Sequence, residues 1–323
     1  MFILGIPRSG TTLLQSLLDG HPQLLVDAAD SRFGSWYRRF YARFGGEKNA
    51  AFDQKLAFAK KVMISHIFSV NSHYYRDFLS HISIEYLEST FSEQVKRSSK
   101  KPKDYLESYF HALGSTSGEL TGKSKYWVDK TLNNEFLYEH YSQWWPESKF
   151  IFVVRDPRAV YATYRLRDKK QGRKVTPVDA FAASWSRSVR SAGKIKKKVR
   201  EKRWLQIQYE ALVSDPEGSI DRMVDFLQIE KTASLFQPTK GHGRAAWVGN
   251  PARGNKENRI FTSSVNRWQT ELNTRDISRI ESLLKTEMAA VQYTASTTEK
   301  FFPALALRQG LRDLKYTLVY RGI

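Results

Sequence analysis

The first eighteen residues place an apolar strand, a glycine-punctuated loop and a helix in direct succession, and this order constrains the fold more than any other feature. Residues 2–4 are apolar, Gly5 and Gly10 bracket the loop, and leucines recur at helical spacing over 13–18. The N–H groups of such a loop point inward, and the dipole of the following helix favours negative charge there. The segment therefore predicts an α/β fold whose first loop binds a phosphate or a closely related anion.

The loop departs from the phosphate loop of a magnesium-dependent nucleotide enzyme. Gly5 and Gly10 have the required spacing, but Thr11 stands where a lysine grips the terminal phosphates. The apolar stretch 150–154 ends in Arg155, whereas the metal-binding strand of such enzymes ends in an aspartate. Both changes favour anion binding without a metal, with Arg8 as the cation of the loop. A P-loop kinase of small molecules stays as the alternative of a different class.

Apolar runs predict five strands, at residues 2–5, 23–26, 126–129, 149–154 and 204–208. Helical patterns separate them, and this alternation predicts a P-loop-like, parallel five-stranded sheet flanked by helices. Ligands of parallel sheets gather beyond the carboxyl ends of the strands. We therefore expect Arg8, Lys130, Arg155 and Tyr209, which follow four of the strands, to meet at one edge of the sheet.

Composition limits the partners and the compartment. The formal net charge of +19 favours anionic partners by long-range attraction. The sequence has no cysteine, which excludes disulfides and thiolate metal sites, and no apolar run approaches the about 20 residues that cross a bilayer. The first strand begins at once, which leaves no room for a signal peptide. We expect a cytoplasmic protein, with an excised lumenal catalytic domain as the alternative. We expect no nucleic-acid partner because no stacking motif accompanies the charge.

Two segments resemble a known family. Residues 5–12 (GIPRSGTT) resemble the 5′-phosphosulfate loop of sulfotransferases that use 3′-phosphoadenosine 5′-phosphosulfate (PAPS). Residues 155–163 (RDPRAVYAT) resemble their 3′-phosphate motif, with Thr163 in place of a serine. The layout is most similar to the tyrosylprotein and bacterial glycan sulfotransferase branch. The resemblance implies PAPS as donor, its desulfated form (PAP) as product and no metal.

The resemblance also assigns roles to single residues. It implies that the phosphosulfate is held by Arg8, Ser9, Gly10, Thr11 and Thr12, and the 3′-phosphate by Arg155 and Thr163. Tyr209 resembles the tyrosine near the adenine, with a core aromatic as the alternative. Lys130 corresponds to the lysine at the leaving oxygen, with a surface lysine that ends a strand as the alternative, and Arg8 is the other cation assigned to catalysis. Arg259 and Ser264 lie in a segment similar to the loop that closes over the donor, and are further contacts.

The general base is assigned by the same resemblance. The base of small-molecule sulfotransferases is a histidine after a Lys-x pair, and of the seven histidines only His242 follows such a pair, Lys240-Gly241, beyond the last predicted strand. The tyrosylprotein branch has Glu-Thr-Arg shortly after His-Pro, and Asp30-Ser31-Arg32 follows His21-Pro22 in a similar way. This implies Asp30 as the base and Arg32 as a contact of the acceptor or the sulfate. Asp27 is the competing carboxylate, and helix capping is the other interpretation of Asp30.

The acceptor site is expected in a helical insertion over residues 30–125, within a single sulfotransferase domain of residues 1–300. Aromatic and arginine side chains lie together in the stretch 33–43, which suits a sugar chain that bears carboxylates or sulfates, with Trp36 as a contact. An amphipathic helix packed by its aromatics is the alternative. We therefore expect polysaccharide sulfation first, and a protein tyrosine or a small molecule as the other acceptors. The basic amphipathic tail, 301–323, predicts contact with an anionic membrane surface.

Overall fold

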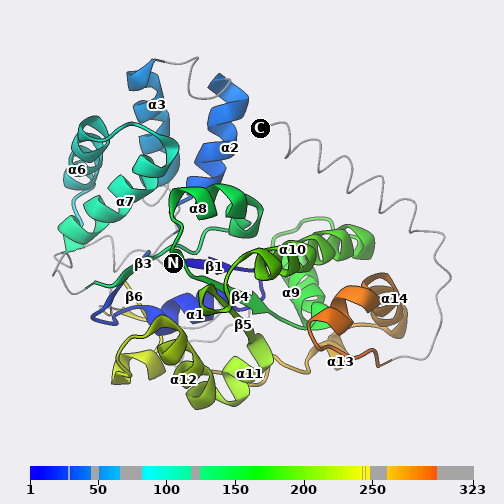
Figure 1. Ribbon diagram of the computed structural model, residues 1–323. Helices are drawn as coiled ribbons and strands as arrows, with labels where there is room; N and C mark the ends of the chain where they lie inside the picture. Colours follow the sequence, from blue (N-terminus) through cyan, green and yellow to red (C-terminus); the bar gives the residue numbers. More distant parts are fainter. Residues whose placement is uncertain are drawn as a thin grey trace.

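The computed structural model describes residues 1–27, 30–44, 51–65, 82–117, 124–241, 243, 245–247 and 260–296. Five parallel strands lie at its centre (Figure 1): β1 (Phe2–Leu4), β2 (Leu24–Val26), β3 (Tyr126–Val128), β4 (Phe150–Val154) and β5 (Trp204–Gln208). Each lies within the range that the sequence predicts. The predicted 301–323 tail lies outside the described residues.

The five strands lie in the order β2-β3-β1-β4-β5. Hydrogen-bonded ladders join β1, β4 and β5 in one sheet and β2 with β3 in another, all parallel. A parallel bridge between Phe2 and Asp129 connects the two, and Ile3 N donates to the Asp129 carbonyl at 2.9 Å. Two short antiparallel strands, β6 (Thr239–Lys240) and β7 (Ala245–Ala246), were not predicted.

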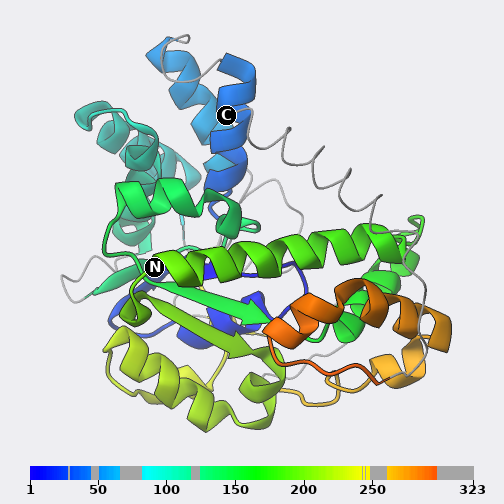
Figure 2. The same ribbon diagram turned by 45° about the vertical axis from the view of Figure 1, so that its right-hand side comes forward.

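Helices cover both faces of the sheet (Figures 1 and 2). One face carries α1 (Thr11–Leu18), α11 (Tyr209–Ser214) and α12 (Pro216–Leu227). The other carries α9 (Pro157–Lys170), α10 (Val178–Lys198) and α14 (Thr274–Ala290). Successive strand residues point to opposite faces, so Ile151 packs toward α1 while Phe150 and Phe152 pack toward α10. A sheet buried on both sides explains why the strands are apolar throughout.

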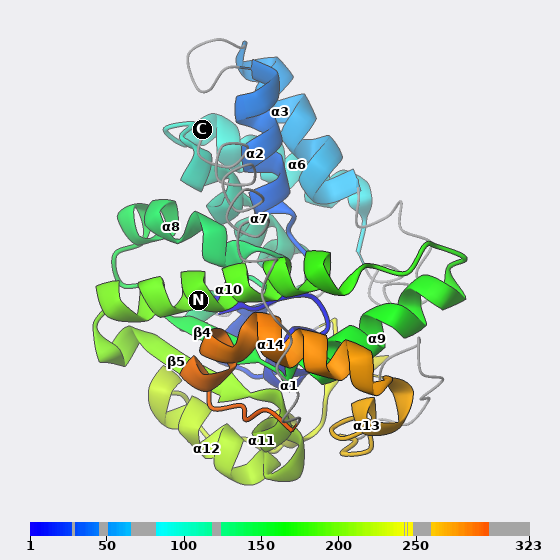
Figure 3. The same ribbon diagram turned by 90° about the vertical axis from the view of Figure 1, so that its right-hand side faces the viewer.

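A helical layer extends the second face beyond β1 and β3. It contains α2 (Phe33–Phe44), α3 (Phe52–Ala59), a π-helical turn (Lys60–Ile64), α6 (Ile84–Arg97), α7 (Pro102–Ser117) and α8 (Tyr138–Trp144). Figure 3 shows α10 between this layer and α14. Short elements complete the described chain: the 3₁₀ turns η2 (Asn134–Leu137), η3 (Glu201–Arg203) and η4 (Ala233–Phe236), and helix α13 (Trp268–Glu271). In the described ranges, no helix is both long and apolar enough to cross a membrane.

Local signals set the helix ends. Asp215 precedes Pro216, and its carboxylate accepts the Gly218 N–H at 3.0 Å, which caps α12. Asp156 caps α9 in the same way through the N–H of Arg158. This second cap starts α9 directly beyond the end of β4, so Arg155 is left at the edge of the sheet.

Candidate active site

The loop after β1 places a glycine, which has no side chain to act as a cap, at the start of α1. Gly10 stands at the N-cap position with φ 103° and makes no side-chain cap hydrogen bond, and the first turn of α1 has no acidic residue. Ser9 is fully buried, and its Oγ donates to the Ile6 carbonyl at 2.8 Å, which braces the loop from inside. The first N–H groups of α1 can therefore bind an external anion.

The ring of Tyr209 lies directly against this loop. A Cβ placed on Gly10 would be 2.4 Å from Tyr209 Cδ2, a distance at which atoms overlap. Glycine is therefore required at position 10 both by its positive φ and by the ring. Tyr209 Oη lies 2.8 Å from Ser264 Oγ, which links the end of β5 to the segment before α13.

Arg155, at the carboxyl end of β4, joins these groups. Its guanidinium lies 4.2 Å from the centroid of the Tyr209 ring. Nη2 donates to the Ser264 carbonyl at 2.8 Å, and Nη1 donates to the Arg8 carbonyl at 3.3 Å. The chain segments that follow β1, β4 and β5 thus meet at one edge of the sheet, where the parallel topology predicts them.

The remaining predicted contacts of the donor are three threonines and Arg259. Thr163 lies on α9 and is 2% exposed, and its Oγ1 donates to the Ala159 carbonyl at 3.0 Å. Its hydroxyl must therefore rotate before it can donate to a phosphate. Thr11 is buried and Thr12 exposed at the start of α1. Arg259 lies outside the described residues.

Lys130 follows β3 and is 8% exposed. Among the residues that the structure describes, no carboxylate lies within ion-pair distance of its ammonium, so a buried cation stands without a counterion. Its neighbour Asp129 is fully buried and accepts hydrogen bonds from Ser31 Oγ at 2.5 Å and Asn134 Nδ2 at 2.7 Å. Burial raises the pKa of Asp129, and these hydrogen bonds oppose the shift. Through Ser31, Asp129 holds the Asp30–Arg32 segment beside Lys130.

The two candidate base carboxylates have different surroundings. Asp27 is fully buried, and its Oδ1 accepts the Tyr109 hydroxyl at 2.9 Å. Asp30 is partly exposed, has φ 151°, and its Oδ1 accepts the N–H of Arg32 at 3.1 Å. Because Arg32 also has a positive φ, 51°, this segment holds two strained residues close together, as functional loops often do.

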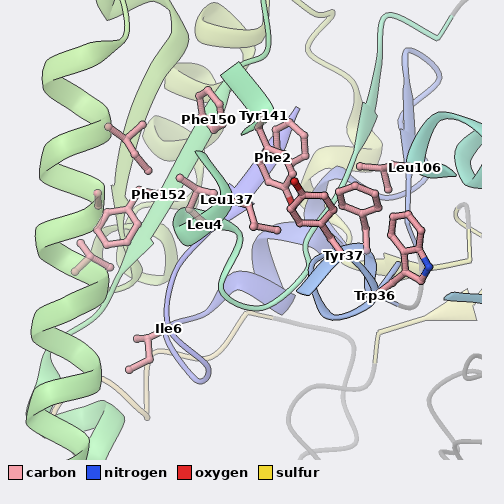
Figure 4. Packing of buried hydrophobic residues seen from close by; sticks show 14 of the residues in the cluster. Phe2, Leu4, Ile6, Trp36, Tyr37, Leu106, Leu137, Tyr141, Phe150 and Phe152 are labelled. Carbon is pink, nitrogen blue, oxygen red and sulfur yellow. The ribbon is translucent and has the colours of Figure 1, made fainter. Parts of the chain in front are cut away.

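The interpretation of Trp36 as an acceptor contact is wrong. Its side chain is 1% exposed, and its ring packs 4.5 Å from Tyr105 and 5.4 Å from Phe40, centroid to centroid. Figure 4 shows the ring within the apolar cluster that also holds Phe2 and Tyr141. For Trp36 the alternative interpretation holds: α2 is an amphipathic helix, and this aromatic side chain packs it into the helical layer.

Sequence reasoning missed two buried carboxylates that organise the site. Asp129 is the first. The second is Glu135 in η2, which is 3% exposed and accepts the Ser188 hydroxyl of α10 at 2.6 Å. Burial raises the pKa of Glu135, and hydrogen bonds from Ser188 and the Gly5 backbone oppose the rise. The position of Asp129 directly before Lys130 was the one available signal, while nothing in the sequence pairs Glu135 with α10.

In the described part of the chain, no three His, Asp or Glu side chains are grouped so that they could hold a metal ion. The positive charges at the sheet edge are instead supplied by arginine and lysine.

The fold is α/β with basic side chains at one edge of the sheet, and comparison with known proteins identifies its family. Residues 1–233 match the sulfotransferase family, so the chain belongs to it. A "Putative protein-tyrosine sulfotransferase" of Caenorhabditis briggsae is 21% identical over 237 residues, which cover 73% of this chain and 68% of that protein.

Two solved structures share the fold. The sulfotransferase domain of the Synechococcus PCC 7002 olefin synthase has a TM-score of 0.58 at 19% identity, covering 91% of this chain and 94% of that domain. The sulfotransferase domain of the curacin biosynthetic pathway has a TM-score of 0.56 at 20% identity, covering 91% and 97%. At these identities the likeness establishes the fold alone.

Proposed function

We propose that this protein transfers the sulfuryl group of PAPS to an acceptor hydroxyl without a metal. The observation that carries the proposal is the meeting of Arg155, Tyr209 and Ser264 against the uncapped N-terminus of α1. Membership of the sulfotransferase family supports the reaction class. A small-molecule kinase lacks support, because the loop has no lysine after Gly10 and β4 ends in Arg155.

The donor has two anionic ends, and the site offers a separate cradle for each. The loop from Arg8 to Thr12 and the N–H groups of α1 suit the 5′-phosphosulfate. Arg155, with Thr163 behind it on α9, suits the 3′-phosphate, since a guanidinium donates two parallel hydrogen bonds to a phosphate. The Tyr209 ring lies between the two cradles, against both Gly10 and Arg155.

In the reaction, the acceptor oxygen bonds to sulfur while the bond from sulfur to the phosphate oxygen breaks. The acceptor proton passes to a base, and negative charge develops on the leaving phosphate oxygen. Lys130 and Arg8 stabilise that charge, and the loop positions the sulfuryl group. Asp30 takes the proton, because it is partly exposed whereas Asp27 is enclosed and bonded to Tyr109. Asp129 positions the Asp30–Arg32 segment through its hydrogen bond with Ser31, and Lys130 follows it directly in the chain.

We propose a carbohydrate as the acceptor, including polyanionic polysaccharides, because the net charge of +19 exceeds what one donor molecule requires. A protein tyrosine is the second candidate, favoured by the C. briggsae relative. Transfer of [35S]sulfate from PAPS to a panel of glycans, tyrosine peptides and phenols tests both. Labelled glycan is the expected product, and labelled peptide alone would replace the carbohydrate assignment.

A further inference from the structure

Glu210 is a carboxylate that none of the assigned roles uses, and it contacts the turn that carries Arg155. It follows Tyr209 at the start of α11 and is partly buried. Its Oε1 accepts the backbone N–H of Asp156 at 3.1 Å. Burial raises the pKa of Glu210, and hydrogen bonds, that from Tyr293 above all, and the charge of Arg155 oppose the rise. The carboxylate therefore lies close enough to Arg155 for their charges to interact.

The peptide group between Arg155 and Asp156 is held at both of its polar atoms. Its N–H donates to Glu210, and its carbonyl accepts Nε1 of Trp185 on α10 at 3.3 Å. Because the peptide group is planar, two hydrogen bonds on opposite sides of it fix its rotation. They therefore restrain the backbone from which the Arg155 side chain leaves, while the guanidinium is held separately by the Ser264 carbonyl.

Glu210 is itself held by a residue from the other end of the described chain. Tyr293 follows α14 and is partly buried, and its Oη donates to Glu210 Oε2 at 2.5 Å. The segment after α14 passes the carboxyl end of β5 (Figure 2), where Gln208 Nε2 donates to the Val291 carbonyl at 2.9 Å. Short hydrogen bonds to a carboxylate are among the stronger ones in proteins. Each oxygen of the Glu210 carboxylate thus has its own donor, which fixes the orientation of the group.

We propose that Glu210 and Tyr293 are positioning residues that hold Arg155 in the orientation that binds the 3′-phosphate, an inference that rests on the proposed function. A guanidinium that is already in place loses less conformational freedom when a phosphate binds, and so it binds more tightly. In the part of the chain that the structure describes, neither residue has a side-chain hydrogen bond to the loop from Arg8 to Thr12. Their loss should therefore weaken binding of the 3′-phosphate and spare the 5′ end of the donor.

The test compares PAP with adenosine 5′-monophosphate, which lacks only the 3′-phosphate. Tyr293→Phe removes one hydroxyl and should lower the ratio of PAP affinity to monophosphate affinity by at least about fivefold in calorimetry, through PAP alone. Tyr161→Phe is the matched control, because it removes a hydroxyl that donates to the Thr176 carbonyl at 3.1 Å, and it should leave the ratio unchanged. In a Glu210→Gln protein, Tyr293→Phe should change the ratio less, because the charged acceptor of its hydrogen bond has gone.

Three results would overturn this role. An unchanged ratio in a folded Tyr293→Phe protein shows that the hydroxyl does not position Arg155. Equal weakening of PAP and the monophosphate shows a structural role for Tyr293 in the whole site. An undiminished effect in the Glu210→Gln protein shows that Tyr293 does not act through Glu210.

A second variant covers the case in which Tyr293→Phe does not fold. Glu210→Asp keeps the charge but is too short to reach both Asp156 and Tyr293, so it should lower the same ratio, and an unchanged ratio overturns the role. Failure of the proposed function is a different result, seen without any substitution. The unchanged protein would then bind PAP no better than the monophosphate, which removes the inference as well.

Discussion

Replacing Gly10 by alanine should disturb the site by an amount that the structure lets us work out. The added Cβ meets Tyr209 Cδ2 at 2.4 Å, and the backbone holds φ at 103°. A left-handed conformation costs an alanine about 1–2 kcal/mol, and overpacking against a ring that stays in place costs about 1–3 kcal/mol. If the ring stays, Gly10→Ala should lower the free energy of unfolding by about 2–5 kcal/mol.

The ring has reasons to stay, because Ser264 bonds its hydroxyl and Arg155 lies over its face. If it moves instead, Arg155 loses its support, and PAP should bind about tenfold more weakly. Removing the ring by Tyr209→Ala separates the two costs. In that background, Gly10→Ala should cost only the backbone part, about 1–2 kcal/mol.

Urea unfolding and PAP calorimetry on the four proteins of this cycle measure both quantities. Gly193→Ala is the control, because Gly193 lies within helix α10 with no described atom within 4 Å of its added Cβ, so it should be neutral or stabilising by up to about 1 kcal/mol. A Gly10→Ala protein with unchanged stability and unchanged PAP affinity would refute the described loop geometry.

Further predictions concern the donor, the base, the core and the tail. Arg155→Ala should weaken PAP binding by about 2 kcal/mol in calorimetry, and an unchanged affinity would remove the 3′-phosphate assignment. Asp30→Asn should keep PAP binding and abolish turnover, whereas full activity moves the base elsewhere; Asp27→Asn is the matched comparison. Trp36→Ala should cost about 3–5 kcal/mol of stability, measured by urea unfolding, through loss of core packing. Deleting 304–323 should reduce sedimentation with anionic liposomes, and unchanged sedimentation would exclude membrane contact through the tail.

The sequence alone predicts the strands and their meeting point, because apolar runs such as 150–154 are buried on both faces and parallel strands share one edge. The sequence therefore predicts that Arg8, Arg155 and Tyr209 meet at this edge of the sheet. The close approach of Tyr209 to Gly10 is a tertiary contact that no local pattern encodes. The role of each residue in binding PAPS stays a prediction.

The helical layer shows where such reasoning stops. Aromatic residues at helical spacing give the same pattern whether they face a core or a ligand, and so Trp36 was misassigned. Asp129 and Glu135 organise the site through Ser31 and Ser188, which lie 98 and 53 positions away in the chain. Contacts at such separations depend on how the insertion and α10 pack on the sheet, which spacing along the chain does not determine.

The central claim is that a loop without lysine holds a sulfated nucleotide while Arg155 holds its 3′-phosphate. Calorimetry of the unchanged protein with PAP, adenosine 5′-monophosphate and ATP with Mg²⁺ tests it directly. We predict that PAP binds at least about tenfold more tightly than the monophosphate, which lacks the 3′-phosphate, and that ATP with Mg²⁺ binds no better than the monophosphate. Tight binding of ATP with Mg²⁺, or equal affinity for PAP and the monophosphate, would contradict the account.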